Sequence, residues 1–410
     1  MIDEPELLYG SDVDAATFAA AFGESLDVAL DLRTWHPGED LAALYDRLAA
    51  EVAAAVEQEN RLLPAFREQV FPRLVDRRGA PPGAGVHSIS PAEIERVHQG
   101  LLFNGDVEAC DGTVQVHDAL PLTVFQVGVS LVAYQGGQGT WMQRLYRRDL
   151  RVAPEDPVEE ALALLERRAE RSGLDQPSVR DQLSALARRA IMTYAERAIL
   201  LHEARAPWRL GHGSPVPFEL LTGSGSVDLM IQATRLLEEL IVGHQRFVFV
   251  PSAPAQRLLL SVGQALLPLQ YAVVETLAEH LAATFEHGHW RGEPTVDTTI
   301  DGRRLTVGQW VRRFHDEVAS QVVVGVYRAG DLAPPQLFYA HRDHAEVAAR
   351  IALADSVLQA HRGFPMLLTI ADRVCASSLG GDTLRGPLDV AYTEAGAPLR
   401  FLAERASRYL

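Results

Sequence analysis

The chain has 410 residues, a net charge of −16 and a hydrophobic content of 47%. This length allows roughly one to three domains, and the hydrophobic content is sufficient for a packed core. The acidic balance argues against a broadly basic nucleic-acid coat protein, although it does not exclude a local basic groove. Lysine is absent, so all 38 basic residues are arginine. Any phosphate contact must therefore be made by a planar, bidentate guanidinium group.

Targeting features are also missing from the sequence. No apolar run approaches the ~18 residues that a membrane span needs. The first residues, Met1 to Glu6, are acidic and polar, whereas a secretory signal is basic and then apolar. The two cysteines, Cys110 and Cys375, have no zinc-site spacing and are predicted to be buried free thiols. These features predict a cytoplasmic protein without a membrane partner.

Residues 1–104 are predicted to form a helical N-terminal region. Residues 41–59 carry apolar side chains at helical spacing. A loop rich in proline and glycine follows at residues 78–85. Ser90, Pro91 and Glu93 then provide a cap residue, a proline at the first helical position and a glutamate at the third. This pattern predicts a short helix that leads into a strand-rich segment.

Three consecutive β-strands are predicted over residues 107–116, 122–134 and 140–148. β-Branched and aromatic residues recur in these runs, and proline and glycine separate them. The pair Asp111-Gly112 is unusual because aspartate is disfavoured inside strands. One explanation is a β-bulge or turn, which is the commonest meaning of Asp-Gly. The other is a carboxylate on the opening strand of a ribonuclease-H-like sheet, placed to bind a divalent cation. The two explanations are compatible.

Helices and strands alternate in the rest of the chain. The predicted helices cover residues 157–171, 178–205, 229–242, 255–284, 345–361 and 366–377, and the predicted strands cover 246–250, 321–328 and 336–341. Adjacent antiparallel strands followed by this alternation predict an α/β fold with a ribonuclease-H-like core. That core is a mixed sheet with an antiparallel three-strand meander and flanking helices, preceded by the helical N-terminal region.

Several short motifs occur in a characteristic order. Asp111-Gly112-Thr113 lies on the first strand of the meander. A helix bearing Glu196 and Glu203 precedes His212-Gly213-Ser214-Pro215, and a buried strand follows over residues 247–252. This order resembles the NurA family of DNA nucleases. That family opens with Asp-Gly-Ser on its first strand and has a glutamate-bearing helix before a second Asp-Gly-Ser-Leu element.

The resemblance extends to the last part of the chain, although residue types differ at motif positions there. The family closes with a Gly-Tyr-Pro turn and a helix that carries a histidine, and here Gly363-Phe364-Pro365 precedes a helix that carries Asp372. His212 stands at the second aspartate position of the family, and Asp372 at its closing histidine position. Both residue types bind metals, but imidazole is a softer ligand than carboxylate and suits manganese better than magnesium.

The resemblance implies a metal-dependent DNA nuclease domain over residues 105–410, with helical insertions, that acts in DNA end processing, repair or defence. Phosphodiester hydrolysis needs an activated water and neutralisation of the developing charge, which Mn²⁺ or Mg²⁺ supplies. The candidate catalytic and metal-binding residues are Asp111, Glu196, His212 and Asp372. Glu203 is an alternative to Glu196, because it lies seven residues later on the same helix, on a similar face.

Each candidate also has a purely structural interpretation. Both glutamates can be solvated helical carboxylates. His212 can be an ordinary turn residue, and Asp372 can pair with Arg373.

Arg144, Arg147 and Arg148 are the candidate DNA-binding residues, because they cluster on the third strand of the meander. Their structural interpretation is a solvated face. The resemblance further implies a homodimer that docks onto a hexameric HerA-type ATPase, which feeds duplex ends into the nuclease.

Two alternatives remain open. The chain can be a catalytically inactive NurA-like subunit that serves as a scaffold for DNA or for the ATPase. It can also be an unrelated α/β protein whose Asp-Gly pair is only a bulge.

Overall fold

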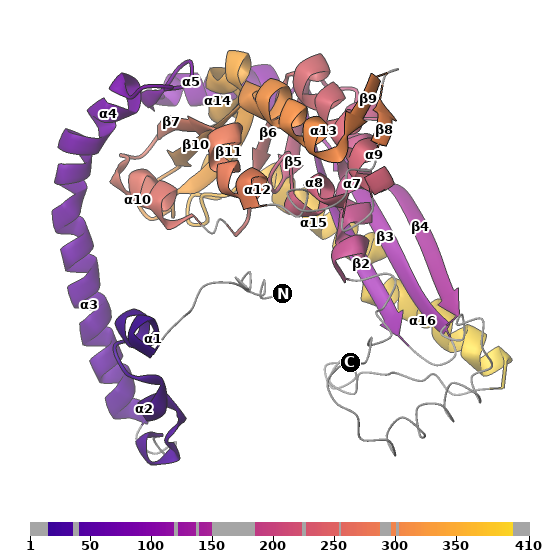
Figure 1. Ribbon diagram of the computed structural model, residues 1–410, viewed down its shortest axis with the longest axis horizontal. Coiled ribbons are helices and arrows are strands. Elements are labelled where there is room, and N and C mark those ends of the chain that lie inside the picture. The colour runs from indigo at the N-terminus through magenta and orange to yellow at the C-terminus, as the bar shows by residue number, and fades with distance from the viewer. Residues whose placement is uncertain are drawn as a thin grey trace. The chain divides into compact units, whose positions relative to one another are not determined.

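The computed structural model describes residues 15–35, 41–118, 122–136, 139–149, 185–223, 227–253, 256–287, 297–300 and 303–396. The chain divides into two compact units, Met1–Pro64 and Ala65–Leu410. The second unit contains the main sheet (Figure 1) and, by its bounds, every candidate site residue. Among the described residues, no helix is both long enough and apolar enough to cross a membrane.

The first unit is helical, as predicted. Its elements are α1 (Ala15–Phe22), α2 (Leu26–Leu30), η1 (Leu32–Thr34) and most of α3 (Leu41–Ala65). The side chain of Ser25 caps α2 by accepting a hydrogen bond from the Val28 backbone N–H at 3.4 Å. On α3, apolar side chains at helical spacing are exposed to solvent: Tyr45, Leu48, Val52 and Val56.

The second unit is built on a nine-stranded sheet with the order β1-β7-β10-β11-β6-β5-β2-β3-β4. The strands are β1 (Gly85–Ser88), β2 (Val107–Asp118), β3 (Leu122–Val132), β4 (Gly139–Asp149), β5 (Trp208–His212), β6 (Phe247–Val250), β7 (Gln270–Thr276), β10 (Val322–Arg328) and β11 (Gln336–His341). A separate hairpin pairs β8 (Asp297–Ile300) with β9 (Arg303–Thr306).

Strands β2, β3 and β4 form the predicted antiparallel meander. Strand β5 pairs in parallel with β2, and β6 pairs in parallel with β5. The resulting order β4-β3-β2-β5-β6 is that of a ribonuclease-H-like sheet, so the predicted fold class is confirmed. Beyond β6 the remaining strands are antiparallel to their neighbours.

The helices of the second unit connect these strands. They are η3 (Phe66–Val70), α4 (Phe71–Asp76), α5 (Pro91–Val97), η4 (His98–Leu102), α7 (Ala185–His202), α8 (Phe218–Leu221), α9 (Val227–Glu238), η6 (Glu239–His244), α10 (Arg257–Ala265), α11 (Leu277–His280), α12 (Ala282–His287), α13 (Val307–Arg313), η8 (Phe314–Val318), η9 (Ala319–Gln321), η10 (Arg342–His344), α14 (Ala345–Val357), α15 (Met366–Leu379) and α16 (Gly381–Glu394). The predicted helix over 157–171 lies outside the described residues.

Two predictions about secondary structure differ from the structure. The single helix predicted over residues 255–284 is wrong, because β7 lies between α10 and α11. Pro268 ends the helical pattern, and the β-branched residues of β7 pack in the sheet between β1 and β10. In addition, β1 lies within the region 1–104 that was predicted to be helical, and it pairs with β7. The helix predicted to start at residue 91 is present as α5, and Ser90 and Glu93 form its capping box.

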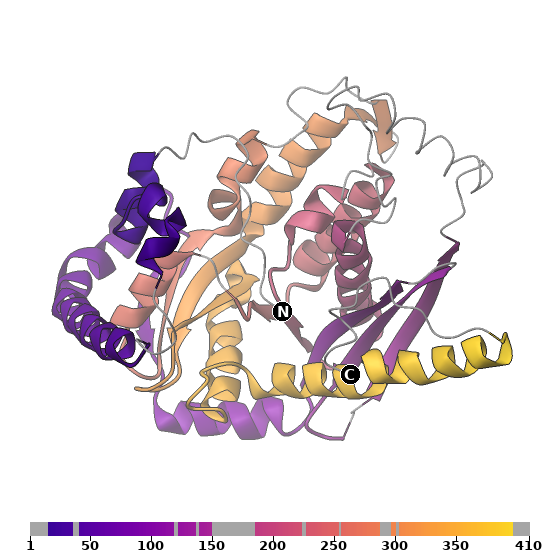
Figure 2. The ribbon, with the colours of Figure 1, turned by 90° about the horizontal axis from the view of Figure 1, so that it is seen from below.

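The sheet is covered on both faces, and alternate side chains enter two cores. Val107 and Ala109 of β2 pack with α5, α14 and α15 on one face. Cys110 packs with α7, α8 and α9 on the other face. Figure 2 shows α15 running along the meander formed by β2, β3 and β4. Because successive side chains of a strand point to opposite faces, Asp111 lies on the same face as Val107 and Ala109 and points toward α15.

Candidate active site

Asp111 lies within β2 and is 6% exposed. The bulge interpretation of Asp111-Gly112 is wrong for β2, because Asp111 pairs with Ser130 and Gly112 with Val129 in an unbroken register. The irregularity occurs instead where β3 pairs with β4, between Val129 and Ser130. Gly112 has a different role. A Cβ atom at this position would lie 2.5 Å from Glu196 Oε1, so only glycine lets the glutamate approach β2 this closely.

His212 is the last residue of β5 and lies next to Asp111. Its Nδ1 atom is 3.2 Å from Asp111 Oδ1, and its ring meets the Phe364 ring edge-on at a centroid distance of 6.2 Å. Burial alone would lower the pKa of His212, but the hydrogen bond to Asp111 and the charge of that carboxylate raise it above its ordinary value. The imidazole is therefore held in one orientation beside the carboxylate.

Asp372 reaches the same place from α15. The Ser130 hydroxyl donates a hydrogen bond to the Ala371 carbonyl at 2.8 Å, which ties this turn of α15 to β3. Asp372 itself is exposed to solvent. Partial desolvation, followed by the charge of Asp111, raises the pKa of Asp372. The two carboxylates thus lie close enough to repel each other electrostatically.

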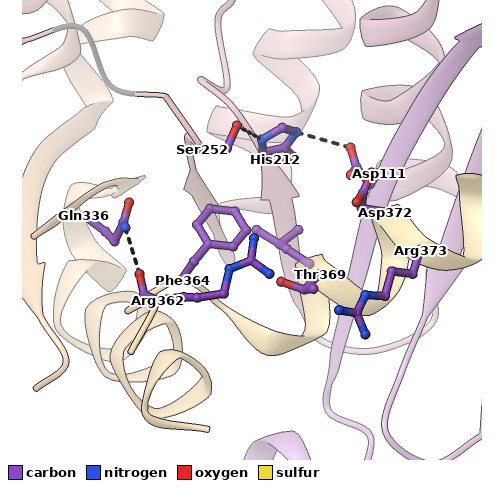
Figure 3. A pocket seen from close by; sticks show the side chains of 10 residues that line it. Asp111, His212, Ser252, Gln336, Arg362, Phe364, Thr369, Asp372 and Arg373 are labelled. Carbon is purple, nitrogen blue, oxygen red and sulfur yellow. Dashed lines mark hydrogen bonds and ion pairs between the residues drawn. The ribbon is translucent and has the colours of Figure 1, made fainter. Parts of the chain in front are cut away.

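Asp111, His212 and Asp372 line one cavity of about 420 Å³ (Figure 3). The other lining residues are Ser252, Gln336, Arg362, Phe364, Leu368, Thr369 and Arg373. In Figure 3 the Arg362 guanidinium lies between Phe364 and Thr369. The cavity therefore combines two carboxylates, an imidazole and two guanidinium groups.

Glu196 approaches from the opposite face of the sheet. It lies on α7 beside Gly112, whereas Asp111 and His212 point toward α15. Its carboxylate contacts the Arg197 guanidinium, which also donates hydrogen bonds to the His212 carbonyl at 3.0 Å and the Ser214 carbonyl at 2.6 Å. Burial, together with the charge of Asp111, raises the pKa of Glu196 to about 7 despite the opposing effect of Arg197. Glu196 thus affects the site electrostatically without lining the cavity.

The structure places the other sequence candidates elsewhere. Glu203 follows the end of α7 and is exposed, away from the cavity. Arg144, Arg147 and Arg148 lie on β4, opposite Val127, Val124 and Thr123 of β3, and their side chains are outside the described part of the chain. Both cysteines are free and buried, and burial raises the pKa of Cys375 to about 12.

The donor set fits a hard divalent cation. Mg²⁺ usually retains several waters and is bound through one or two carboxylates, and Mn²⁺ accepts the same oxygen ligands together with imidazole. Asp111 and Asp372 form such a carboxylate pair, and both face the cavity. Within the described residues, no group of three or more histidine, cysteine, aspartate or glutamate side chains is arranged to hold a metal ion. The remaining ligands of a cation here would be water or substrate oxygens.

Several cavity residues were missed by sequence reasoning. Ser252 follows β6 by two residues, and Arg362 lies in the turn before α15. The signal for Ser252 was its position, because ligands bind beyond the carboxyl ends of adjacent parallel strands. Strands β5 and β6 are such a pair, and they end at His212 and Val250.

Comparisons with known proteins give structural matches only. No protein-family model matches the chain, and no curated protein sequence is similar to it. Its structure is similar to that of the NurA nuclease from Sulfolobus solfataricus, with 10% sequence identity, a TM-score of 0.44, and coverage of 86% of this chain and 98% of that chain. A NurA structure with manganese aligns over 85% of this chain and 98% of that chain, with 9% identity and a TM-score of 0.36. Endonuclease V from Streptomyces avermitilis aligns over 79% and 94%, with 13% identity and a TM-score of 0.25.

Proposed function

We propose that this chain is a divalent-metal-dependent DNA nuclease of the NurA type, with residues 105–410 as its nuclease domain. One observation carries the proposal: carboxylates for a cation and guanidinium groups for a phosphate line the same cavity. Asp111, His212 and Asp372 come from three distant segments of the chain, so sequence proximity does not explain their convergence. The motif order that resembles the NurA family points to the same residues.

Each residue has a role that follows from its position. Asp111 and Asp372 hold the cation, Mn²⁺ or Mg²⁺, which when bound activates water and neutralises charge on the scissile phosphate. Arg362 and Arg373 bind the phosphodiester, because a guanidinium offers paired donors to phosphate oxygens. Asp111 orients His212 beside the cation site. Glu196, paired with Arg197, affects the site electrostatically from the opposite face of the sheet.

The proposed biological role and partners are those that the resemblance to the NurA family implies. The protein acts in DNA end processing, repair or defence, as a homodimer bound to a hexameric HerA-type ATPase. Arg144, Arg147 and Arg148 on the edge strand β4 extend the DNA path away from the cavity.

The test is cleavage of labelled single- and double-stranded DNA with Mn²⁺, Mg²⁺ or a chelator, with and without the ATPase. Asp111→Asn and Asp372→Asn are expected to abolish cleavage and to weaken Mn²⁺ binding measured by calorimetry. Asp331→Asn is the matched control, because Asp331 is exposed and lies outside the cavity. Cation binding and DNA binding without cleavage would instead support the catalytically inactive scaffold. Cleavage at an equal rate by Asp111→Asn and the wild type would refute the site.

A further inference from the structure

Three cavity residues form a continuous hydrogen-bonded relay that metal-dependent hydrolysis does not require. Asp111 Oδ1 is 3.2 Å from His212 Nδ1, and His212 Nε2 is 2.9 Å from Ser252 Oγ (Figure 3). The relay therefore has the order carboxylate, imidazole, hydroxyl. This is the arrangement of an orienting group, a general base and a nucleophile.

The direction of each hydrogen bond follows from the donors that are present. An ionised carboxylate only accepts, so the neutral imidazole carries its proton on Nδ1 and donates it to Asp111. Nε2 is then an acceptor, and the Ser252 hydroxyl must be the donor in the second hydrogen bond. The serine proton thus already points at the base that would remove it.

The fold holds these groups in place and leaves the hydroxyl accessible. Asp111 lies within β2, and His212 ends the adjacent parallel strand β5. Arg197 donates to the His212 carbonyl, which fixes the backbone at that point. Ser252 follows β6 and is exposed at the cavity, so a small molecule can reach its oxygen.

We propose that Ser252 is a nucleophile, with His212 as its general base and Asp111 as a positioning residue, and that the cation-free site hydrolyses small carboxylic esters. The electrophile is an uncharged ester because the Asp111 carboxylate lies at the end of the relay and disfavours an anionic phosphate at Ser252 when no cation is bound. Phe364 and Leu368 offer apolar surface for the acyl group, and a cavity of about 420 Å³ suits a small organic molecule.

The chemical steps balance without any redox partner. Ser252 Oγ forms a bond to the ester carbonyl carbon while its proton moves to His212 Nε2. The tetrahedral intermediate expels the alcohol, which takes that proton and leaves an acyl-serine. A water molecule then attacks the acyl carbon and gives a proton to Nε2. Collapse of the second intermediate releases the carboxylic acid and returns the proton to Ser252.

The first experiment uses the full chain in chelator, so its outcome is independent of the metal-dependent cleavage proposed above. The protein is incubated with a fluorophosphonate probe, and the labelled peptide is identified by mass spectrometry. Ser377→Ala is the matched control, because Ser377 is exposed and lies outside the cavity. We expect the probe on Ser252 in the wild type and in Ser377→Ala, and no labelling of Ser252→Ala. Labelling that is absent or lies only on other residues would overturn the proposal.

The second experiment measures turnover of p-nitrophenyl acetate under the same conditions. Ser252→Ala and His212→Ala are expected to lower kcat at least tenfold, whereas Ser377→Ala keeps the wild-type rate. Asp111→Asn should lower kcat with KM unchanged, since the amide can donate to Nδ1 and favour the wrong tautomer. Equal turnover by Ser252→Ala and Ser377→Ala would show that hydrolysis occurs on other surface groups, and the proposal would be wrong.

Discussion

The buried carboxylate of Asp355 supports the helix that carries Asp372. Asp355 lies on α14 and is completely buried. It accepts a hydrogen bond from the Tyr134 hydroxyl at 2.6 Å and another from the Leu367 backbone N–H, in the first turn of α15, at 2.8 Å. Burial raises the pKa of Asp355 to about 6, although both hydrogen bonds oppose this effect. Replacing it with asparagine keeps the shape and removes the titration.

The size and sign of the effect of Asp355 on the unfolding free energy follow from the difference between its pKa values in the folded and unfolded states. The pKa difference between 3.8 and about 6 is about two units, or about 3 kcal/mol. Because the folded pKa of Asp355 is the higher one, the stabilisation is fully present below about pH 4 and is lost as the pH rises through about 6. The unfolding free energy of the wild type, relative to Asp355→Asn, should therefore fall by about 3 kcal/mol between pH 3.5 and 8. Roughly half of that fall occurs between pH 5 and 8.

Urea unfolding followed by circular dichroism at a series of pH values measures this difference. Asp331→Asn is the control for a general charge effect, because Asp331 is exposed. It should keep the pH slope of the wild type. If Asp355→Asn also keeps the wild-type slope, Asp355 is not a titrating buried acid and the reasoning fails.

The remaining predictions concern the proposed nuclease. Asp111→Asn should lose cleavage while keeping its circular dichroism spectrum and urea midpoint to within about 1 kcal/mol, because the amide keeps the shape of the carboxylate; a collapsed spectrum would make it a folding residue. Replacing both Arg147 and Arg148 with alanine should weaken DNA binding and reduce the slope of log K against log salt by up to about 0.9 per lost phosphate contact, and an unchanged slope would remove them from the DNA path. Wild-type activity should favour Mn²⁺ and decline on acidification as His212 becomes protonated, at a higher pH than an ordinary histidine because Asp111 raises the pKa of His212. His212→Asp should shift the preference toward Mg²⁺, because it places a third carboxylate beside the cation site, and an unchanged metal preference would show that residue 212 does not reach the cation.

The sequence was most informative where local pattern and tertiary structure agree. The meander was predictable because β-branched runs and turn residues set both the strands and their antiparallel pairing. The convergence of Asp111, His212 and Asp372 on one cavity follows the motif order, because each motif lies on a fixed element of the sheet or of α15. The sequence could not separate Glu196 from Glu203, since helical spacing gives the face of a helix and not its burial.

Other features needed the structure because they depend on contacts between distant segments. The apolar run over residues 255–284 reads as one long helix, and only the pairing of β7 with β1 and β10 shows where Pro268 ends the helix and the β-branched residues begin a strand. The role of Gly112 depends on Glu196, a residue far away in sequence. Ser252 ends the strand motif over residues 247–252 and Arg362 precedes the Gly363-Phe364-Pro365 turn, but neither is a candidate until β6 and α15 bring them to the cavity.

The late position of α15 in the chain affects how the protein is made. The hydrogen bond between Ser130 and Ala371 joins residues that are 241 positions apart. At about 5–20 residues per second, a ribosome needs roughly ten to fifty seconds to cover that interval. During this time the hairpin of β2 and β3 can already exist, with Asp111 in place, but Asp372 and the wall of the cavity do not. A chain that ends before α15 therefore lacks Asp372 and one wall of the cavity, so the candidate site is completed only after α15 has been synthesised.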